Sequence, residues 1–213
     1  MTLEELILRV NYSLRGIDDD TPAEGTDEWD YWSSLLNKKI DELYSDTTKN
    51  WNIAYDKQDL GAVDENSVSI TLPTDFMSAS DKALLVTADE TIEIDIVKAN
   101  DRSKGVFIAG FPSKLFFSVP LTKSGNLWLP GYYKPAYPSA TSDIVPLPDA
   151  NWGVAAVAAD VAFSDITYED KAEALQARAN YLYTLMNKNN RRATYGSPRV
   201  TSYVVDRIRG VQG

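Results

Sequence analysis

The residue types that most often carry catalysis or bind metal ions are missing from this 213-residue chain. It has no histidine and no cysteine. Histidine is the usual general base near neutral pH and the commonest zinc ligand, and cysteine supplies thiolate nucleophiles, disulfides and soft metal ligands. Most hydrolase triads, zinc enzymes and thiol enzymes are therefore excluded. Carboxylates, lysines and tyrosines remain, and we expect a protein that is not an enzyme and holds no cofactor or metal ion.

The acidic run Asp18–Asp20 invites a test for calcium binding. An EF-hand loop needs oxygen ligands at alternate positions, a glycine at the sixth position and a glutamate at the twelfth. Counted from Asp20, the sixth residue is Gly25 but the twelfth is Tyr31, and counted from Asp18 neither position fits. The run therefore indicates a polar loop between two helices rather than a metal site.

A second set of carboxylates, Glu93 and Asp95, alternates with isoleucines. Two carboxylates that flank a sugar cleft can hydrolyse a glycosidic bond. Alternation with apolar residues is instead typical of the solvent face of a strand, and we expect that role here. The chain also lacks the GxxxxGK[ST] phosphate loop and the GxSxG nucleophile motif.

Four aromatic residues, Trp128, Tyr132, Tyr133 and Tyr137, lie close together in a segment rich in proline. Exposed aromatic rings stack on sugars or nucleotides, so one interpretation is a glycan-binding module. The other interpretation is a proline-rich loop that packs its rings onto the folded body. We expect packing, and we keep glycan binding as the alternative function.

The basic residues gather at the C-terminal end. The net charge is −10, but between residues 187 and 213 six basic residues stand against one acidic residue, which gives +5 there and −15 for residues 1–186. Arginines interleaved with Tyr195 and Tyr203 resemble a nucleic-acid-binding arm. The acidic body would repel DNA, however, and this property suits a conduit through which DNA slides without sticking.

Two helices are predicted at the N-terminal end. Thr2 and Glu5 have the spacing of a capping box, an apolar stripe follows over residues 3–14, and Gly16 is a plausible stop. A second helix starts near Thr26 or Asp27 and fades over residues 46–50. These two helices precede a region of different periodicity.

Two further helices are predicted after residue 148. The first has a face rich in small residues, which lets another helix approach closely, and its members are Trp152, Ala155, Ala156, Ala159, Ala162 and Phe163. Residues 164–168 interrupt the pattern, and Thr167 with Asp170 has the spacing of a second capping box. The last helix ends near residues 188–189, so the two form an antiparallel hairpin.

Between these helix pairs the apolar period is that of strands. Short strands are predicted near residues 68–72, 84–86, 92–96, 106–108, 115–119 and 127–129, with a hairpin turn at residues 123–126. Eight of the ten prolines lie between residues 51 and 148, which argues against long helices there. We therefore expect an α+β fold with a four-helix bundle-like core, an antiparallel β insertion and an extended C-terminal arm. The helical core comprises residues 1–50 and 149–190, the β-rich insertion residues 51–148, and the basic arm residues 191–213.

No membrane or export signal is expected. Residues 1–14 lack the basic start, apolar run and small-residue cleavage site of a signal peptide. No stretch approaches the roughly 18 apolar residues that cross a bilayer. We expect a soluble protein, made in the cytoplasm, without a membrane partner.

Five segments occur in a recognisable order along residues 1–190. They are Leu6–Asn11, the acidic run Asp27–Asp30, the strand Ile70–Phe76 that runs into Leu-Pro-x-Asp-Phe, Gly131–Pro135, and Tyr168–Ala172 after the alanine-rich helix. In these segments the chain resembles the head-to-tail adaptor (connector) proteins of tailed bacteriophages, which form rings beneath the portal. Each segment is a packing pattern rather than a chemical signature.

The resemblance implies a structural virion protein at the head–tail interface, made in the host cytoplasm. It implies a ring of about twelve copies around a DNA channel. The portal protein would lie on one side and tail or nozzle proteins on the other, and double-stranded DNA would pass through without specific binding. The alternative function is a virion-associated tail or surface module that binds glycans through the aromatic cluster.

The resemblance also implies that the C-terminal arm reaches onto the portal. Valines and tyrosines of the arm would add a strand to an edge of the portal, and its arginines would meet an acidic surface. The candidate portal-binding residues are Arg191, Arg192, Arg199, Val200, Tyr203, Val204, Val205, Arg207 and Arg209.

Overall fold

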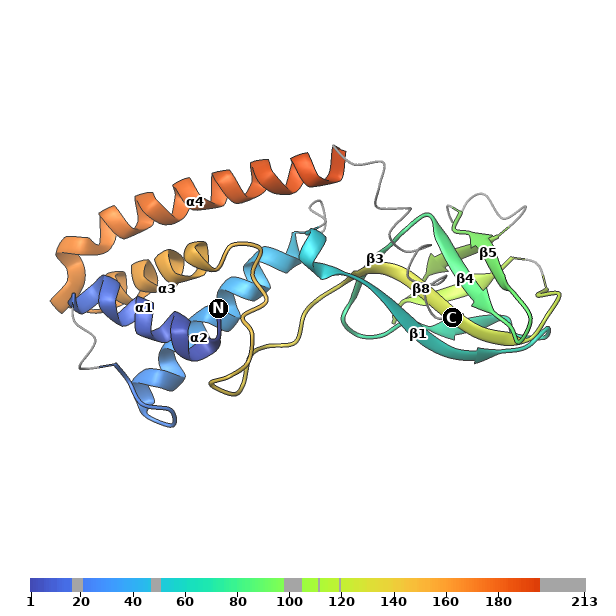
Figure 1. Ribbon diagram of the computed structural model, residues 1–213, viewed down its shortest axis with the longest axis horizontal. Coiled ribbons are helices and arrows are strands. Elements are labelled where there is room, and N and C mark those ends of the chain that lie inside the picture. The colour runs from blue at the N-terminus through green and yellow to red at the C-terminus, as the bar shows by residue number, and fades with distance from the viewer. Residues whose placement is uncertain (17–20, 47–50, 98–104, 111, 119, 196–213) are drawn as a thin grey trace, which may run out of the picture. The chain divides into compact units, whose positions relative to one another are not determined.

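The two N-terminal helices form where their capping and apolar patterns predict them (Figure 1). The computed structural model describes residues 1–16, 21–46, 51–97, 105–110, 112–118 and 120–195, with the backbone alone for residues 191–195. Helix α1 (Leu3–Arg15) opens on a complete Thr2–Glu5 capping box and ends at Gly16, whose φ of 75° suits a left-handed cap. Helix α2 (Asp27–Ser45) begins after Thr26, whose hydroxyl accepts a hydrogen bond from the amide of Trp29.

The two helices after residue 148 form the predicted antiparallel hairpin. Helix α3 (Ala150–Ser164) is capped by Asp149, whose carboxylate accepts from the amide of Asn151 at 2.9 Å. A short 3-10 turn, η2 (Ile166–Tyr168), leads into helix α4 (Glu169–Tyr195). The capping contact in this turn comes from Asp165, which accepts from the amide of Thr167, and not from the expected Thr167–Asp170 pair.

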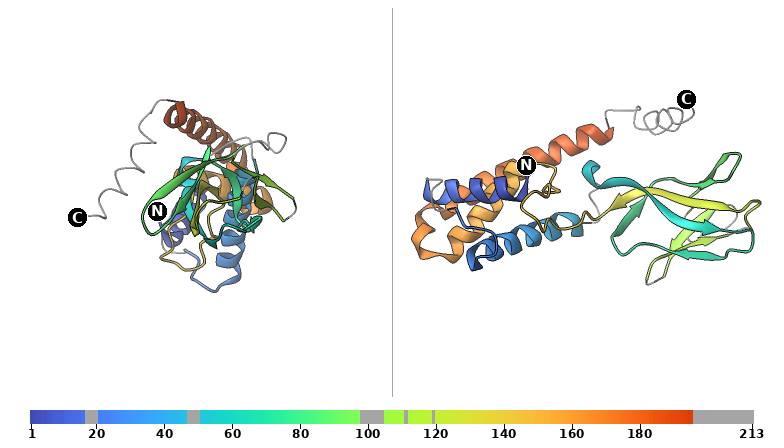
Figure 2. Two further views of the ribbon diagram at one scale, coloured as in Figure 1. Left: turned by 90° about the vertical axis from the view of Figure 1, so that its right-hand side faces the viewer. Right: turned by 60° about the horizontal axis from the view of Figure 1, so that its bottom comes forward.

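Helix α3 lies at the centre of the helical unit. It packs against α1, α2 and α4, and ten of its fifteen residues are buried. Alanines and valines fill all sides of this helix, so the neighbouring backbones approach closely without large side chains between them. Figures 1 and 2 show that the longer α4 runs along α3 and extends beyond it.

The insertion consists of antiparallel strands in two sheets. One sheet holds β1 (Tyr55–Val63), β8 (Gly125–Tyr133), β4 (Lys82–Val86) and β5 (Thr91–Asp95) in that order, with β3 (Phe76–Ala79) also paired to β8. The other holds β2 (Ser69–Thr71), β7 (Lys114–Phe117) and β6 (Val106–Ala109). A short helix, η1 (Asn52–Ala54), precedes β1. The six predicted strand positions are confirmed, although β1 and β3 had no counterpart among them.

Both sheets contribute to one hydrophobic core. Its buried members are Val63, Leu72, Ala83, Leu85, Val106, Leu115, Leu127 and Leu129. Alternation along the strands sends these side chains inward, and most of the intervening residues are partly or fully exposed. Glu93 and Asp95 are exposed on β5 as expected, and Glu93 forms an ion pair with Lys82 of β4.

The expected hairpin at residues 123–126 is wrong. Strand β7 pairs with β2 and β6, whereas β8 pairs with β1, β3 and β4. The turn therefore joins two sheets rather than two neighbouring strands. Local turn chemistry identified the reversal of the chain, but strand pairing depends on contacts that are distant in sequence.

The expected proline-rich loop begins later than predicted, because strand β8 continues past the predicted strand at residues 127–129 and ends at Tyr133. A proline cannot donate a hydrogen bond within a sheet, so it is unusual in an inner strand. Pro130 lies where β8 changes its partner from β4, which pairs with residues 126–128, to β3, which pairs with residues 131–133. The missing amide hydrogen therefore falls at a break in the ladder, and the carbonyl of Pro130 accepts from the amide of Ser80.

The chain divides into a helical unit, Met1–Ser45 with Ala136–Gly213, and a β unit, Asp46–Pro135. The fold class is α+β, as expected. Residues 136–148, which the sequence analysis placed in the insertion, hydrogen bond to the start of the chain: the amide of Leu3 donates to Asp143 and that of Val145 to Met1. They belong with the helices for that reason.

Candidate interaction surfaces

The first five residues of the predicted partner-binding arm, 191–195, are helical. Arg191 and Arg192 belong to the last turns of α4, which continues to Tyr195, so residues 191–195 are helical rather than extended. The other candidates lie outside the described residues: Arg199, Val200, Tyr203, Val204, Val205, Arg207 and Arg209. The helix runs on because residues 188–195 contain neither glycine nor proline, which first appear at Gly196 and Pro198.

Three of the four residues of the aromatic cluster lie on the two faces of β8, whereas Tyr137 lies in the helical unit, where its hydroxyl donates to the carboxylate of Asp41. Tyr133 is buried, its hydroxyl donates to the carbonyl of Leu129 at 2.7 Å, and burial raises its pKa. Trp128 and Tyr132 are half-buried on the opposite face of the strand. The three rings therefore do not form one surface, because residues 132 and 133 point in opposite directions.

The outer face of β8 carries a row of aromatic rings with a lysine. The ammonium of Lys57 on β1 lies 4.7 Å from the ring centroid of Trp128, and Tyr55 meets Tyr132 edge-to-face at 5.3 Å. Burial lowers the pKa of Lys57, while the nearby charge of Asp59 works in the opposite direction. Lys57 covers the face of the Trp128 ring on which a sugar would stack. This row therefore resembles a packed strand surface more than an open sugar-binding surface.

The turn between α3 and α4 presents an acidic surface with two exposed apolar side chains. Phe163 is 61% exposed and Ile166 is 87% exposed. Four exposed carboxylates surround them, on Asp165, Glu169, Asp170 and Glu173, and together these six residues, here called the acidic surface, line an open hollow of about 630 Å³. Apolar side chains this exposed within a rim of one charge are typical of an interaction site.

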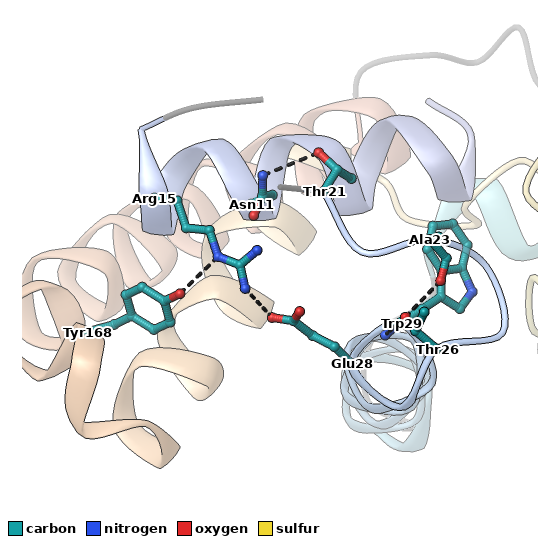
Figure 3. Close-up of polar contacts among 8 residues, drawn as sticks. All are labelled: Asn11, Arg15, Thr21, Ala23, Thr26, Glu28, Trp29 and Tyr168. Carbon is teal, nitrogen blue, oxygen red and sulfur yellow. Dashed lines mark hydrogen bonds and ion pairs between the residues drawn. The ribbon is translucent and has the colours of Figure 1, made fainter. Parts of the chain in front are cut away.

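A polar network holds this turn against α1 and α2 (Figure 3). The guanidinium of Arg15 donates to the hydroxyl of Tyr168 at 2.9 Å and forms an ion pair with Glu28 at 2.5 Å. The same guanidinium lies 5.8 Å from the ring centroid of Trp32. Because one planar guanidinium contacts all three partners, it links η2 on one side to α1 and α2 on the other.

Backbone hydrogen bonds also shape the acidic surface. The amide and hydroxyl of Thr167 hold the pKa of Asp165 below its ordinary value, and the charge of Arg15 acts in the same direction. On the neighbouring helix, the ammonium of Lys171 donates to the carbonyl of Leu14. The turn is therefore anchored at both sides of η2, and Asp165 is ionised at neutral pH.

A second surface lies between α1 and α4, and we call it the α1–α4 groove. Leu8 and Tyr12 are exposed there, Tyr12 by 58%. Two arginines flank them: Arg9, whose guanidinium donates to the side-chain oxygen of Asn151 at 3.4 Å, and Arg178. The groove has a volume of about 320 Å³ and offers apolar contact between two positive charges.

The two surfaces lie on opposite sides of α4. Lys171 and Arg178, seven residues apart, face α1. Glu173 lies on the acidic surface, and Gln176 lines a small hollow shared with Lys39 of α2. One helix therefore separates a basic groove from an acidic surface.

Neither surface follows from the sequence pattern. The spacing of Phe163, four residues after Ala159, predicts a place on the packed face of α3, yet the side chain lies outside the core. Val161 and Ala162 in the same turn are buried whereas Phe163 is exposed, so helical spacing alone does not predict burial there. The available signal was the isolated pair Phe163 and Ile166 beside a run of acidic residues at the start of α4.

Among the residues that the structure describes, no three histidine, cysteine, aspartate or glutamate side chains gather as they would around a metal ion. No helix within those residues is long and apolar enough to span a membrane. A scan against models of known protein families found no match, and a search of curated proteins found no relative.

Proposed function

We propose that this protein is a structural head-to-tail adaptor of a tailed bacteriophage, a ring subunit under the portal that joins capsid to tail and lets DNA pass. Its helices would form a bundle-like core, and its C-terminal arm would reach the portal. The proposal comes from the resemblance of the sequence to such adaptors. A structural role requires neither histidine nor cysteine, and the chain contains neither.

The observation that carries the proposal is the insertion of an entire β unit into a helical unit. Four helices in the described chain build one compact unit, and Asp46–Pro135 builds another from two antiparallel sheets. This is the element order that the resemblance implies. A chain of this kind offers separate surfaces to separate partners, which is what a connector requires.

Exposed apolar side chains on the helical unit support an assembled state. Tyr12, Phe163, Ile166 and Tyr181 each expose more than half of their side-chain surface. Groups of this size and exposure mark protein–protein contacts when they cluster beside charged residues. A ring subunit has such contacts on both of its sides.

The charge distribution supports passage of DNA. Residues 1–186 carry −15, so a channel lined by this part of the chain would repel the phosphate backbone. The arm, with its excess of arginine, would bind a different partner through charge-assisted hydrogen bonds. The acidic part of the chain thus suits the passage of DNA, and the basic arm suits attachment to a partner.

Glycan binding is the second candidate. Trp128 and Tyr132 lie on the same face of β8 and are half-buried rather than enclosed, which favours it. Trp128→Ala would then abolish glycan binding without unfolding the β unit. Binding of the wild-type chain to a glycan array at background level would remove this candidate.

Truncation after Tyr195 tests the proposed adaptor role of the arm. This end point keeps α4 whole, whereas a cut at Asn190 would remove its last turn. We expect residues 1–195 to keep the helical circular dichroism of the full chain and to lose binding to the portal protein in co-sedimentation. Binding at wild-type strength by the truncated chain would contradict the role assigned to the arm.

A further inference from the structure

We propose that the acidic surface of one copy of this chain packs into the α1–α4 groove of a second copy. The inference rests on the proposed function, which requires copies to meet side by side, and it assigns the residues that meet. It concerns the helical unit alone. No further partner is needed for the contact.

The two surfaces are complementary in charge. Four carboxylates surround Phe163 and Ile166 on the acidic surface. The groove presents the guanidiniums of Arg9 and Arg178 on either side of Leu8 and Tyr12. Arginine pairs with carboxylates through two parallel hydrogen bonds, so the contact would gain orientation as well as attraction.

The two surfaces are also complementary in their apolar parts. Ile166, at 87% exposure, and Phe163, at 61%, project from the acidic surface. The groove, at about 320 Å³, is hollow and has an apolar floor that includes Val154. A projecting apolar pair at the centre and charges at the rim is the usual anatomy of a protein interface.

The positions of the surfaces favour a ring over a symmetric dimer. They lie on opposite sides of α4, so each copy would use one surface toward one neighbour and the other surface toward the next. Such heterologous contacts generate rings when the rotation closes. A two-fold dimer through either surface would instead place like charges together, which opposes it.

The second copy is the occupant that the charges favour. A chain with −15 on residues 1–186 repels its own copies in most orientations. In the part of the helical unit that the structure describes, the groove brings two arginines next to exposed apolar side chains. Two copies would therefore associate preferentially with the acidic surface of one in the groove of the other.

Disulfide trapping tests this contact in a chain with no cysteine of its own. Tyr12→Cys lies in the groove and Ile166→Cys on the acidic surface, and both positions are exposed, so folding should be retained. The two single variants are mixed and oxidised at chain concentrations up to about 1 mM, where even a contact with a millimolar Kd is occupied in about a quarter of the molecules or more. The control replaces Ile166→Cys with Ile144→Cys, because Ile144 is also apolar, 68% exposed and in the helical unit, but outside both surfaces.

We expect the mixture of Tyr12→Cys and Ile166→Cys to form disulfide-linked dimers at least several times faster than the control mixture. A chain with both substitutions should form a ladder of higher oligomers. Equal rates in both mixtures, or single variants that cross-link to themselves as fast as to each other, would overturn the proposal.

Charge reversal gives a second, independent measurement on the full chain. Arg178→Glu or Glu173→Arg added to both trapping variants should slow cross-linking severalfold, and the two reversals together should restore it. Lys188→Glu, at another exposed position of α4, is the matched control and should have no effect. Reversals that do not slow cross-linking, or a pair that does not restore it, would contradict the assigned residues.

This test is separate from the test of the adaptor role. Cross-linking needs this chain alone, whereas the truncation experiment needs the portal protein. A cross-linked ladder without portal binding would reject the adaptor and keep the contact. Portal binding without specific cross-linking would reject the contact and keep the adaptor.

Discussion

Single polar side chains position the segment after Tyr133, one through a contact with a helix and one through bonds within the segment. The hydroxyl of Tyr44 on α2 donates to the carbonyl of Pro146 at 2.8 Å, and both groups lie in a mostly buried region. The carboxylate of Asp143 accepts from the amides of Ser139 and Ala140, each at 2.8 Å. These bonds position a stretch that has no regular structure of its own, so each can be tested by one substitution.

Tyr44→Phe removes one buried hydrogen bond and leaves the carbonyl of Pro146 without its donor. We expect the free energy of unfolding to fall by about 1–2 kcal/mol at pH 7, measured by urea denaturation. Tyr31→Phe is the control, because the hydroxyl of Tyr31 bonds to Ser164 at an exposed position and its loss should cost less. Equal losses for both variants would contradict a buried role for Tyr44.

The same tyrosine predicts a pH dependence. Burial raises the pKa of Tyr44 well above its ordinary value. An unfolded tyrosine ionises near pH 10, so the wild-type protein should lose stability as the pH rises above about 10, while the folded phenol stays protonated. Tyr44→Phe should lack this part of the loss. Parallel stability curves for the two proteins between pH 9 and 11 would contradict it.

Asp143 predicts the opposite dependence. Hydrogen bonds from the amides of Ala140 and Ser139 hold the pKa of Asp143 below its ordinary value. A lowered folded pKa contributes stability above the unfolded pKa of about 4, and this contribution is lost as the pH falls through the folded value. Asp143→Asn should therefore lower the melting temperature at pH 7 and have a diminishing effect below about pH 4. A constant difference across this range would show that the charge of Asp143 is irrelevant.

At the scale of the elements, α3 determines how closely the other helices approach. Ala158 and Ala159 have no exposed surface, and Gly153 lies so near Leu147 and Leu6 that an added methyl group would contact them. Small side chains on several sides of one helix allow close packing but leave no room for larger ones. The helical unit should therefore be sensitive to volume in this helix.

Ala159→Leu is the direct test of this packing. The added atoms have no space, so we expect a loss of about 1–3 kcal/mol in the free energy of unfolding, measured by urea denaturation. Ala174→Leu, at an exposed position of α4, is the control and should change stability by less than about 0.5 kcal/mol. Similar values for the two variants would mean that α3 is not tightly packed.

The helices were predictable because their signals are local. The Thr2–Glu5 capping box and the Gly16 stop depend on contacts within a few residues, and both are present. The end of α4 was predicted too early because the residues after position 188 are mostly polar and show no apolar stripe. The helix nevertheless continues to Tyr195, since no glycine or proline interrupts it before Gly196.

The sheets were less predictable because strand pairing is not local. Strand β1 was missed because Tyr55–Val63 contains few apolar residues and a register shift between Asp59 and Gly61, so its alternation is broken. It forms because β8 supplies a long partner. Pro130 also argued against a strand as long as β8. The sequence does not show that Pro130 lies where β8 changes its partner strand, and this is seen only in the folded sheet.

The interaction surfaces were the least predictable feature. Phe163 has the spacing of a core residue, and Arg9 and Arg178 lie 169 positions apart. Folding brings these arginines to one groove and leaves Phe163 outside the core. A surface assembled from distant segments has no signature in a single sequence.

At the scale of the whole molecule, the uneven charge is the dominant property. The charge of −15 on residues 1–186 would oppose contact between copies in most orientations and would repel DNA, while the basic end would favour an acidic partner. Both effects are electrostatic, so salt above about 0.5 M should weaken attachment of the arm more than it weakens apolar contacts. The proposed adaptor would thus assemble on a partner rather than spontaneously at low concentration.

The mass of the chain in solution, alone and mixed with the portal protein of the same phage, tests the adaptor role most directly. Size-exclusion chromatography with light scattering at micromolar concentration should give a monomer of 23.7 kDa for the chain alone. In the mixture we predict a complex in which several copies are bound to each portal ring. An unchanged monomer in the presence of the portal protein would contradict the adaptor role.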